Sequence, residues 1–515
     1  MPDRRRILGF ALLLAPLALA AGCFDRGGTA PAANASPKSA DSKAHPTNSG
    51  APGITTPGDT DTQGGKPDAK SGAMRGPQPK KGSDQAVSVT PDQAIDPKSL
   101  TDVVKEEVKG GESTSAAGPT PLNYLWLPAD VSLVKDEPMT VAPPLGLEPI
   151  MGKVPLANPM TKKKVELGKQ LYFDARISKD GTVSCATCHN PEKGWTDNLR
   201  GSIGINGQVG SRNSPTVLNT VYGRTMFWDG RAPSLEGQAQ GPVQNKIEMG
   251  DQSYKEIIER LRTIPGYRES FKVVFGTDVT LDGVAKAIAA FERTALSGNS
   301  AYDRYERQAD PDKPETFKVL SDSAKRGMVL FGLRLNPDDP FRPGVALKKA
   351  NCTSCHAGSN FSDEQFHNLG VGWSEKERKF ADLGRFVIEP VGAKNTADIG
   401  AFKTPTVRDI VKTAPYMHDG SEKTLLEIVE FYDKGGNPNP TLDTQMRPLK
   451  LTAGEKADLV EFMKALTGEA TAVALPTLPA GPDGKSPDPR AALTPPGPKA
   501  SASTSAGDVH AAIGH

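Results

Sequence analysis

The clearest chemistry in the sequence lies in two copies of one short motif. Each copy has two cysteines separated by two residues, and a histidine follows at once. This pattern is typical of a c-type haem attachment site, because the thiols bond to the porphyrin and the imidazole binds its iron. The copies use four of the five cysteines of the chain, and they are Cys185-Ala-Thr-Cys188-His189 and Cys352-Thr-Ser-Cys355-His356. The pattern predicts two covalently attached haem c groups.

Two other chemistries use paired cysteines. A pair of Cys-x-x-Cys motifs can form a four-thiolate zinc site, and a single one can act as a redox dithiol. Neither explains why a histidine stands in the same adjacent position twice. The sequence therefore favours haem attachment over both alternatives.

The residues that must position these motifs lie in the middle of the 515-residue chain. No aromatic residue occurs between Phe24 and Tyr124, and that run is rich in Pro, Gly, Ala, Ser and Thr. Such a segment buries too little apolar surface to offset its conformational entropy. The C-terminal end of the chain has the same character. We therefore expect a disordered tether at 23–123, a folded core at 124–468 and a disordered tail at 469–515.

The N-terminus has the features of an export signal. Three arginines at 4–6 precede the apolar run Ile7–Ala21, which is too short to span a bilayer comfortably. Small residues then precede Cys23, as in the cleavage box of bacterial lipoproteins, although Ala20 stands where that box usually has leucine. Ordinary cleavage just before the cysteine is the alternative. We expect a signal peptide at 1–22 and a periplasmic protein anchored to the membrane by a lipid on Cys23.

The core repeats itself along the chain. Its matching landmarks are helices near 165–173 and 324–331, Arg212-Asn-Ser-Pro215-Thr-Val217 and Phe402-Lys-Thr-Pro405-Thr-Val407, Trp228-Asp-Gly230 and His418-Asp-Gly420, and closing helices near Leu281–Leu296 and Thr452–Leu466. Thr452 is the expected N-cap of the last helix. The repeat predicts a mainly α fold of two tandem cytochrome c-like haem domains, 124–310 and 311–468, with few strands.

The repeat also allows the two irons to be compared. Tyr432 lies fourteen residues after His418, and Pro242 lies fourteen residues after Trp228. A phenolate can bind iron, whereas a proline side chain cannot. The comparison predicts an open position on the first iron and a second iron bound by His356 and Tyr432. The alternative is that Tyr432 is a half-buried core aromatic.

An open haem iron can cleave hydrogen peroxide if side chains move protons, because heterolysis needs both a base and an acid. Gln238 and Glu248 lie on either side of Pro242 in the sequence. Desolvation beside a largely apolar haem face favours the protonated form of a carboxylate, which suits a proton shuttle. The alternative is that both are solvated loop residues.

With these motifs in family order, the core resembles the bacterial di-haem cytochrome c peroxidases and their MauG-type relatives over about residues 150–468. The motifs that carry the resemblance are Leu167-Gly-Lys-Gln-Leu-Tyr-Phe-Asp174, Cys185-Ala-Thr-Cys-His189, Arg212-Asn-Ser-Pro-Thr216, Phe227-Trp-Asp-Gly-Arg231, Gln238 to Glu248, Cys352-Thr-Ser-Cys-His356 and Thr413-Ala-Pro-Tyr-Met-His-Asp-Gly420.

The resemblance implies roles for individual residues. Trp228 matches a tryptophan that relays electrons between the two haems, and Gln238 and Glu248 match residues of the distal pocket of the peroxidatic haem. His418 matches a histidine near the second haem that is not its usual axial ligand.

The resemblance also implies one calcium ion between the haems. Its ligands would be Asn213 and the main-chain carbonyls of Thr413 and Pro415. Calcium prefers hard oxygen donors and water, so these groups are chemically suitable.

The sequence departs from the typical peroxidases in two places. Their first iron is capped, until the second is reduced, by a histidine at the position that Ile205 occupies here. The first haem is therefore expected to be open without reductive activation. Tyr432 stands where their high-potential haem has a methionine, and a His–Tyr haem is the MauG-type arrangement. Met417 as the ligand instead would return the protein to the ordinary electron-transfer cytochromes.

The predicted function is that of an exported oxidoreductase of the cytochrome c peroxidase type. Hydrogen peroxide would bind at the iron held by His189, with help from Glu248 and Gln238, and Trp228 would connect it to the second haem. The external electron donor would be a small cytochrome c or copper protein, or an oxidisable side chain of a partner protein. The formal net charge of +1, with no basic stripe interleaved with aromatics, gives no support to nucleic-acid binding.

Two other hypotheses remain open. The protein could be a non-catalytic di-haem electron carrier, with both irons capped by residues such as Met417, His367 or His418. It could also be a membrane-tethered redox or peroxide sensor, although no signalling domain is visible in the sequence.

Overall fold

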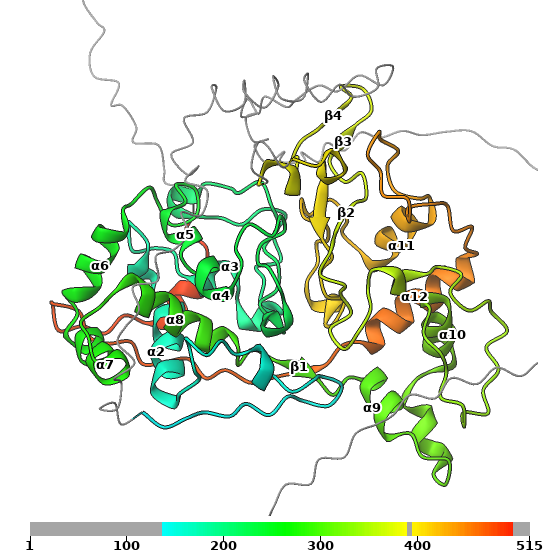
Figure 1. Ribbon diagram of the computed structural model, residues 1–515, viewed down its shortest axis with the longest axis horizontal. Coiled ribbons are helices and arrows are strands. Elements are labelled where there is room, and N and C mark those ends of the chain that lie inside the picture. The colour runs from blue at the N-terminus through cyan, green and yellow to red at the C-terminus, as the bar shows by residue number, and fades with distance from the viewer. Residues whose placement is uncertain (1–135, 389–393, 498–515) are drawn as a thin grey trace, which may run out of the picture. The chain divides into compact units, whose positions relative to one another are not determined.

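The computed structural model describes residues 136–388 and 394–497 (Figure 1). The predicted signal peptide, the lipid anchor at Cys23 and the tether up to 123 lie outside the described residues. Helices and loops dominate the described part, and its strands form three two-stranded antiparallel ladders. Among the described residues, no helix is long and apolar enough to cross a membrane. The expectation of a mainly α fold with few strands is confirmed.

A first group of helices surrounds the first cysteine motif. Its members are α2 (Lys162–Phe173), α3 (Cys185–Cys188), α4 (Leu235–Gln238), α5 (Gly241–Gln244), α6 (Tyr254–Arg262), α7 (Pro265–Phe275) and α8 (Leu281–Glu292). They bury a cluster of apolar side chains that includes Leu171, Phe271 and Ile288. Helix α8 ends at Glu292 rather than at the expected Leu296, because the chain there turns into the first strand.

A second group of helices surrounds the second motif and has its own apolar cluster. Its members are α9 (Ala301–Gln308), α10 (Asp322–Phe331), α11 (Leu425–Asp433) and α12 (Ala453–Ala465). Tyr305 belongs to this cluster, so α9 packs with the second group although the predicted boundary lies at 310. Thr452 caps α12 as expected, since its hydroxyl accepts a hydrogen bond from the Glu455 amide.

One helix pair in each group is packed through a glycine. A Cβ at Gly168 in α2 would lie 1.9 Å from the carbonyl oxygen of Ala287 in α8. A Cβ at Gly327 in α10 would lie 1.9 Å from the carbonyl oxygen of Asp458 in α12. Only glycine allows the backbones to approach so closely. These two glycines are also matched in the sequence repeat.

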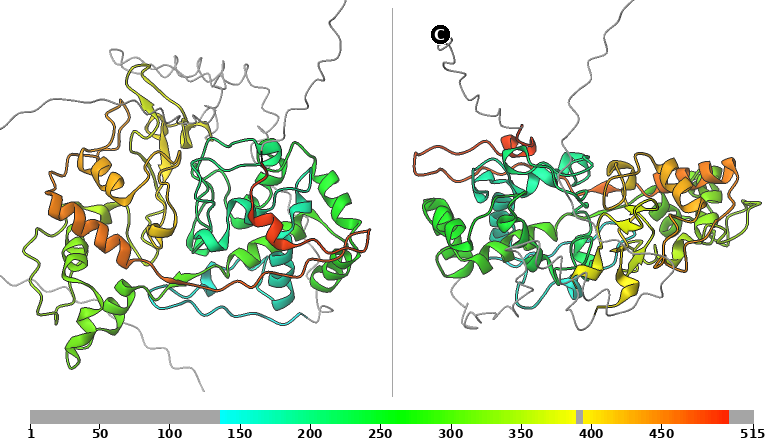
Figure 2. Two further views of the ribbon diagram at one scale, coloured as in Figure 1. Left: turned by 180° about the vertical axis from the view of Figure 1, so that it is seen from behind. Right: turned by 90° about the horizontal axis from the view of Figure 1, so that it is seen from above.

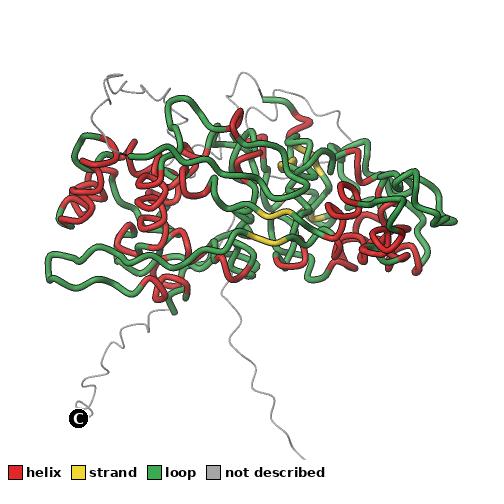
Figure 3. Tube along the Cα trace, turned by 90° about the horizontal axis from the view of Figure 1, so that it is seen from below, coloured by secondary structure: helices red, strands yellow, loops and turns green. Residues whose placement is uncertain are grey.

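Two of the three strand pairs join segments that are distant in the sequence, and the third is a local hairpin; Figure 3 shows the strands in yellow. The pairs are β1 (Ser297–Gly298) with β6 (Glu469–Ala470), β2 (Phe366–Asn368) with β5 (Ala401–Lys403), and β3 (Trp373–Ser374) with β4 (Lys379–Phe380). In the second pair His367 lies opposite Phe402. This ladder forms part of the wall around the second motif.

The predicted disordered tail is wrong for residues 469–497, which run back along the first helical group (Figure 2). Leu478 and Ala492 are each 2 % exposed, and Val473, Leu475 and Leu493 pack against the first apolar cluster. The segment has too few apolar residues to form a core of its own. It is ordered because it adds them to a core that already exists. Residues 498–515 lie outside the described part.

Candidate haem-binding sites

The first motif begins a helical turn that orients its histidine. Cys185–Cys188 form α3, and His189 follows as its C-cap. The Nδ1 atom of His189 lies 2.9 Å from the Pro215 carbonyl oxygen, which can only accept a hydrogen bond. Nδ1 therefore carries the proton, and Nε2 is left as the basic nitrogen that can bind iron. The Tyr172 hydroxyl donates to the His189 carbonyl (2.9 Å) and fixes the main chain at this point.

The second motif repeats this orientation. The Nδ1 atom of His356 lies 3.1 Å from the Phe361 carbonyl oxygen, so its Nε2 is likewise left basic. The cysteines of both motifs carry unpaired thiols, and burial raises the pKa of Cys188 and of Cys352 to about 12. Unpaired, half-buried thiols beside a basic imidazole nitrogen suit covalent haem attachment. The residues present therefore fit the group that the motifs imply.

A cavity of about 300 Å³ lies at the second motif. Cys352, Cys355 and His356 line it, as do apolar side chains from the second helical group. Those apolar side chains include Phe331, Val407, Ile428, Leu459 and Met463. A largely apolar wall is what a buried porphyrin needs.

Tyr432 and Met417, the two alternative ligands of the second iron, both line this cavity. Tyr432 lies on α11 and is half-buried. Burial, and then the nearby sulfurs of Cys352 and Cys355, hold the pKa of its phenol above the ordinary value. His418 also lines the cavity and stacks on the Phe402 ring, with centroids 3.5 Å apart.

Trp228 connects the two halves of the chain. Its indole Nε1–H donates to the Asn213 carbonyl (2.8 Å), and its own carbonyl accepts from the Lys403 amide (2.8 Å). The Asn213 amide in turn donates to the His418 carbonyl (2.7 Å). Trp228 lines the second cavity as well.

The three residues expected to bind calcium line the same cavity: Asn213, Thr413 and Pro415. The side-chain Nδ2 of Asn213 donates to the Leu199 carbonyl (2.7 Å), so the side-chain Oδ1 points the other way. Asn198 holds the neighbouring backbone, because its side chain donates to the carbonyls of Lys412 (2.9 Å) and Ala414 (3.0 Å).

Glu248 lies at the first motif. Its charge acts on the Cys188 thiol, and Asn245 donates a hydrogen bond to its Oε1 atom (2.8 Å). Burial raises the pKa of Glu248, with a smaller opposing effect from Arg231. The role of Glu248 as a proton shuttle stays a prediction. Gln238 is half-buried at the end of α4, which packs against α5 ahead of Glu248.

The loop that would hold a capping histidine in the typical peroxidases is anchored beside Glu248. The Ile205 amide donates to the Glu248 carbonyl (3.0 Å), and the Ile205 side chain is 5 % exposed within the first apolar cluster. An aliphatic side chain cannot bind iron, and this one is committed to the core.

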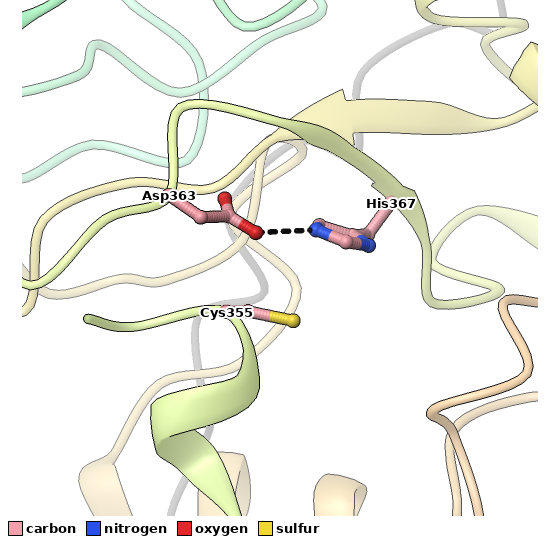
Figure 4. A group of neighbouring side chains, drawn as sticks. All are labelled: Cys355, Asp363 and His367. Carbon is pink, nitrogen blue, oxygen red and sulfur yellow. Dashed lines mark hydrogen bonds and ion pairs between the residues drawn. The ribbon is translucent and has the colours of Figure 1, made fainter. Parts of the chain in front are cut away.

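Sequence reasoning missed the ion pairs that His367 and Arg212 make. His367 lies with both ring nitrogens against carboxylates, and Figure 4 shows it with Asp363 beside Cys355. It is therefore not available as an axial ligand, contrary to one hypothesis for an electron carrier. Arg212 pairs with both oxygens of Asp382 (2.7 and 2.9 Å) and with Asp229 (2.5 Å). In the sequence, the sign that Arg212 has a structural role was its place next to Asn213 in a repeated motif.

Comparison with known proteins gives consistent matches over the folded part. The family model described as di-haem cytochrome c peroxidase matches residues 162–311. The methylamine utilization protein MauG of Methylorubrum extorquens is 39 % identical over 327 residues, which cover 63 % of this chain and 84 % of that protein. The cytochrome c551 peroxidase of Pseudomonas aeruginosa is 32 % identical over 329 residues, with coverage of 63 % and 84 %.

A solved structure matches as well. The crystal structure of a MauG-like protein associated with microbial copper homeostasis aligns with a TM-score of 0.52 and 31 % sequence identity, covering 65 % of this chain and 95 % of that one.

Proposed function

We propose a specific chemistry for this chain, which belongs to the di-haem cytochrome c peroxidase family and is an oxidoreductase of that type. Cys185, Cys188 and His189 would hold a first haem, the site of hydrogen peroxide reduction. Cys352, Cys355, His356 and Tyr432 would hold a second haem, the route for electrons to that site. The haem groups, when bound, supply redox-active iron. The observation that carries the proposal is the shared cavity in which the second motif, Tyr432 and Trp228 meet.

Glu248 is the proton-transferring residue in this proposal. Reduction of peroxide to water consumes protons as well as electrons, so a group that can donate a proton is needed beside the first haem. Glu248 is half-buried, burial raises the pKa of its carboxyl, and a hydrogen bond from Asn245 holds it in place. Gln238 provides an amide that can orient peroxide by hydrogen bonding without exchanging a proton itself.

The first iron is proposed to be accessible to peroxide in the oxidised protein. Ile205 is buried in the core where a capping histidine would stand, and Pro242, in the first turn of α5, is the sequence counterpart of Tyr432. Neither side chain has an atom that binds iron. This arrangement removes the need for a reductive activation step.

Trp228 is the proposed relay between the haems. Its indole donates to the Asn213 carbonyl and its own carbonyl accepts from the Lys403 amide, and these two bonds hold it in one position at the border of the second cavity. A relay residue has to stay in place, since electron transfer is steeply sensitive to distance. A calcium ion bound by Asn213, Thr413 and Pro415 would stiffen the same border.

The matching glycine contacts in the two helical groups support a further proposal, that the core is an internal duplication of one cytochrome c-like unit. We place the protein in the periplasm, with Cys23 as a lipid anchor.

The electrons that reduce hydrogen peroxide would come from a small cytochrome c or a copper protein.

A second function is favoured by Tyr432 and by the likeness to a methylamine utilization protein MauG. The same site would then draw its electrons from an oxidisable side chain of a partner protein. A His–Tyr second haem and an open first haem serve either donor.

One experiment separates the enzyme from a carrier. The fully oxidised protein is mixed with a stoichiometric amount of hydrogen peroxide before any reductant is added, and the visible and electron spin resonance spectra are followed. An open first haem gives a high-spin ferric signal that peroxide abolishes at once. Two low-spin haems that do not react until reductant is added would overturn the proposal.

A further inference from the structure

The His367 imidazole is held between two carboxylates at the edge of the second cavity. Its Nδ1 atom lies 2.6 Å from Asp443 Oδ2, and its Nε2 atom lies 3.0 Å from Asp363 Oδ2. Figure 4 shows the ring and the Asp363 carboxylate above the Cys355 sulfur, and these three residues keep their ligand atoms within 4.8 Å of one another.

This geometry requires a cation. An ionised carboxylate only accepts hydrogen bonds, so both ring nitrogens have to carry a proton for both contacts to be favourable. The Cys355 thiol raises the pKa of His367 before haem is attached, and Asp443 and Asp363 raise it whether or not haem is attached, against the opposing effect of burial. The three side chains are only about one-fifth exposed, so solvent screens the charges incompletely.

The first motif has a comparable aspartate, Asp197, but no imidazole is paired with it in the described part of the chain. Asp363 Oδ1 accepts from the Gln365 main-chain amide (2.9 Å). Asp197 Oδ1 accepts from the Leu199 main-chain amide in the same way (2.9 Å). Asp197 Oδ2, however, is buried without a hydrogen-bond partner in the described part of the chain. The imidazolium is therefore a feature of the second site alone.

The ion pair also ties down a wall of the cavity. Asp443 belongs to the segment that follows Tyr432, and its amide donates to the Asn368 carbonyl on β2 (2.9 Å). The segment returns to α11 through the Leu449 amide, which donates to the Asp433 carbonyl (3.0 Å). His367 and Asp443 both line the cavity.

A metal ion could in principle use Cys355, Asp363 and His367, since their ligand atoms are close together. Two observations argue against it. Both nitrogens of His367 are already bonded to carboxylates. The Cys355 sulfur becomes a thioether when haem is attached, and a thioether is a poor ligand beside carboxylates.

We propose that His367 is a positioning residue that acts on the second haem as a fixed positive charge at its Cys355 edge, raising the reduction potential of that haem. A nearby cation favours the reduced state, which carries one positive charge fewer than the oxidised state. The anionic Tyr432 phenolate and the two carboxylates act in the opposite direction. The imidazolium offsets them and keeps the second haem reducible by an external donor. This inference rests on the proposed attachment of the second haem.

The test uses the full-length, haem-loaded protein and a spectroelectrochemical titration of each haem. His367→Gln leaves two carboxylates without a counter-charge, and the midpoint potential of the second haem should fall. Asp443→Asn removes one negative charge and keeps the cation, and the same midpoint should rise. The first haem, which has no such pair, should keep its midpoint in both variants.

Two further variants separate charge from packing. The double variant H367Q/D443N has the same net charge at this edge as the unaltered protein, so its midpoint should return towards the original value. His367→Lys keeps a cation and should lie closer to the original value than His367→Gln. Shifts in the same direction for His367→Gln and Asp443→Asn, or no shift in either, would overturn the inference, because a loosened cavity has no dependence on the sign of the charge removed.

Haem content distinguishes this inference from the proposed function. Peptide mass spectrometry of the unaltered protein should find haem on Cys352 and Cys355. Its absence contradicts the proposed function itself. Haem that is present, with midpoints that do not follow the charge, contradicts the role of His367 alone.

Discussion

The indole nitrogen of Trp228 donates a hydrogen bond to the main-chain carbonyl of Asn213 at 2.8 Å. An amide carbonyl is too weak a base to take the indole proton, so this contact holds the ring without offering a proton acceptor. The bond joins two landmarks of the sequence repeat, and the ring lies at the border of the second cavity.

Trp228→Phe should slow electron transfer between the haems, because phenylalanine is much harder to oxidise than tryptophan. It should also cost about 1–3 kcal/mol of stability, since the Asn213 carbonyl loses its donor. Stopped-flow measurement of reoxidation by peroxide checks the rate. Trp373→Phe, in the β3–β4 ladder, is the matched control and should leave the rate unchanged. Equal rates in both variants would remove Trp228 from the electron path.

Glu248→Gln should slow peroxide consumption by ~10²-fold or more, because the amide cannot transfer a proton. Glu259→Gln makes the same change at an exposed position of α6 and should have no effect. Near-normal turnover of the Glu248 variant would contradict the proposed shuttle.

The pH profile gives a second check on Glu248. Burial raises its pKa, so the protonated form persists to a higher pH than for an ordinary glutamate. Turnover that depends on this proton should stay high below the raised pKa and fall as the pH rises through it. The Glu248→Gln variant should lose that limb of the profile, and a limb that survives the substitution must belong to another group.

Tyr432→Phe should alter the spectrum of the second haem and leave that of the first intact, because the phenyl ring keeps the packing and removes the ligand oxygen. Met417→Leu is the informative control, since both residues line the same cavity. Resonance Raman and electron spin resonance spectra of the ferric protein distinguish the two. If only the Met417 variant changes the second haem, the ligand is the thioether and not the phenolate.

Leu478→Ala should destabilise the protein by about 2–5 kcal/mol, because the side chain is 2 % exposed in a segment that packs back onto the core. Leu156→Ala removes the same atoms from a side chain that is fully exposed, and it should change the stability by about 0.5 kcal/mol or less. Denaturant unfolding of the full chain measures both. Equal, small effects would mean that the C-terminal segment contributes nothing to the fold.

Much of the site could be predicted from local sequence because haem attachment is itself a local pattern. The thiols and the histidine of each motif are neighbours in the chain, so their spacing alone indicates the chemistry. The helices at 162–173 and 453–465 were likewise visible in the apolar periodicity and in the Thr452 cap. The assignments of Tyr432, Trp228 and Glu248 came from comparing the two halves of one sequence and from a family resemblance.

Only the tertiary structure decided which distant residues share a cavity. Asp443 binds a histidine 76 positions earlier in the chain, and no spacing rule relates the two. The C-terminal segment was misjudged for a similar reason: its composition rules out an independent core, but not the burial of a few leucines and valines against a surface that the rest of the chain provides. Local covalent chemistry is encoded by neighbours in sequence, whereas charge pairing and burial depend on which segments the fold brings together.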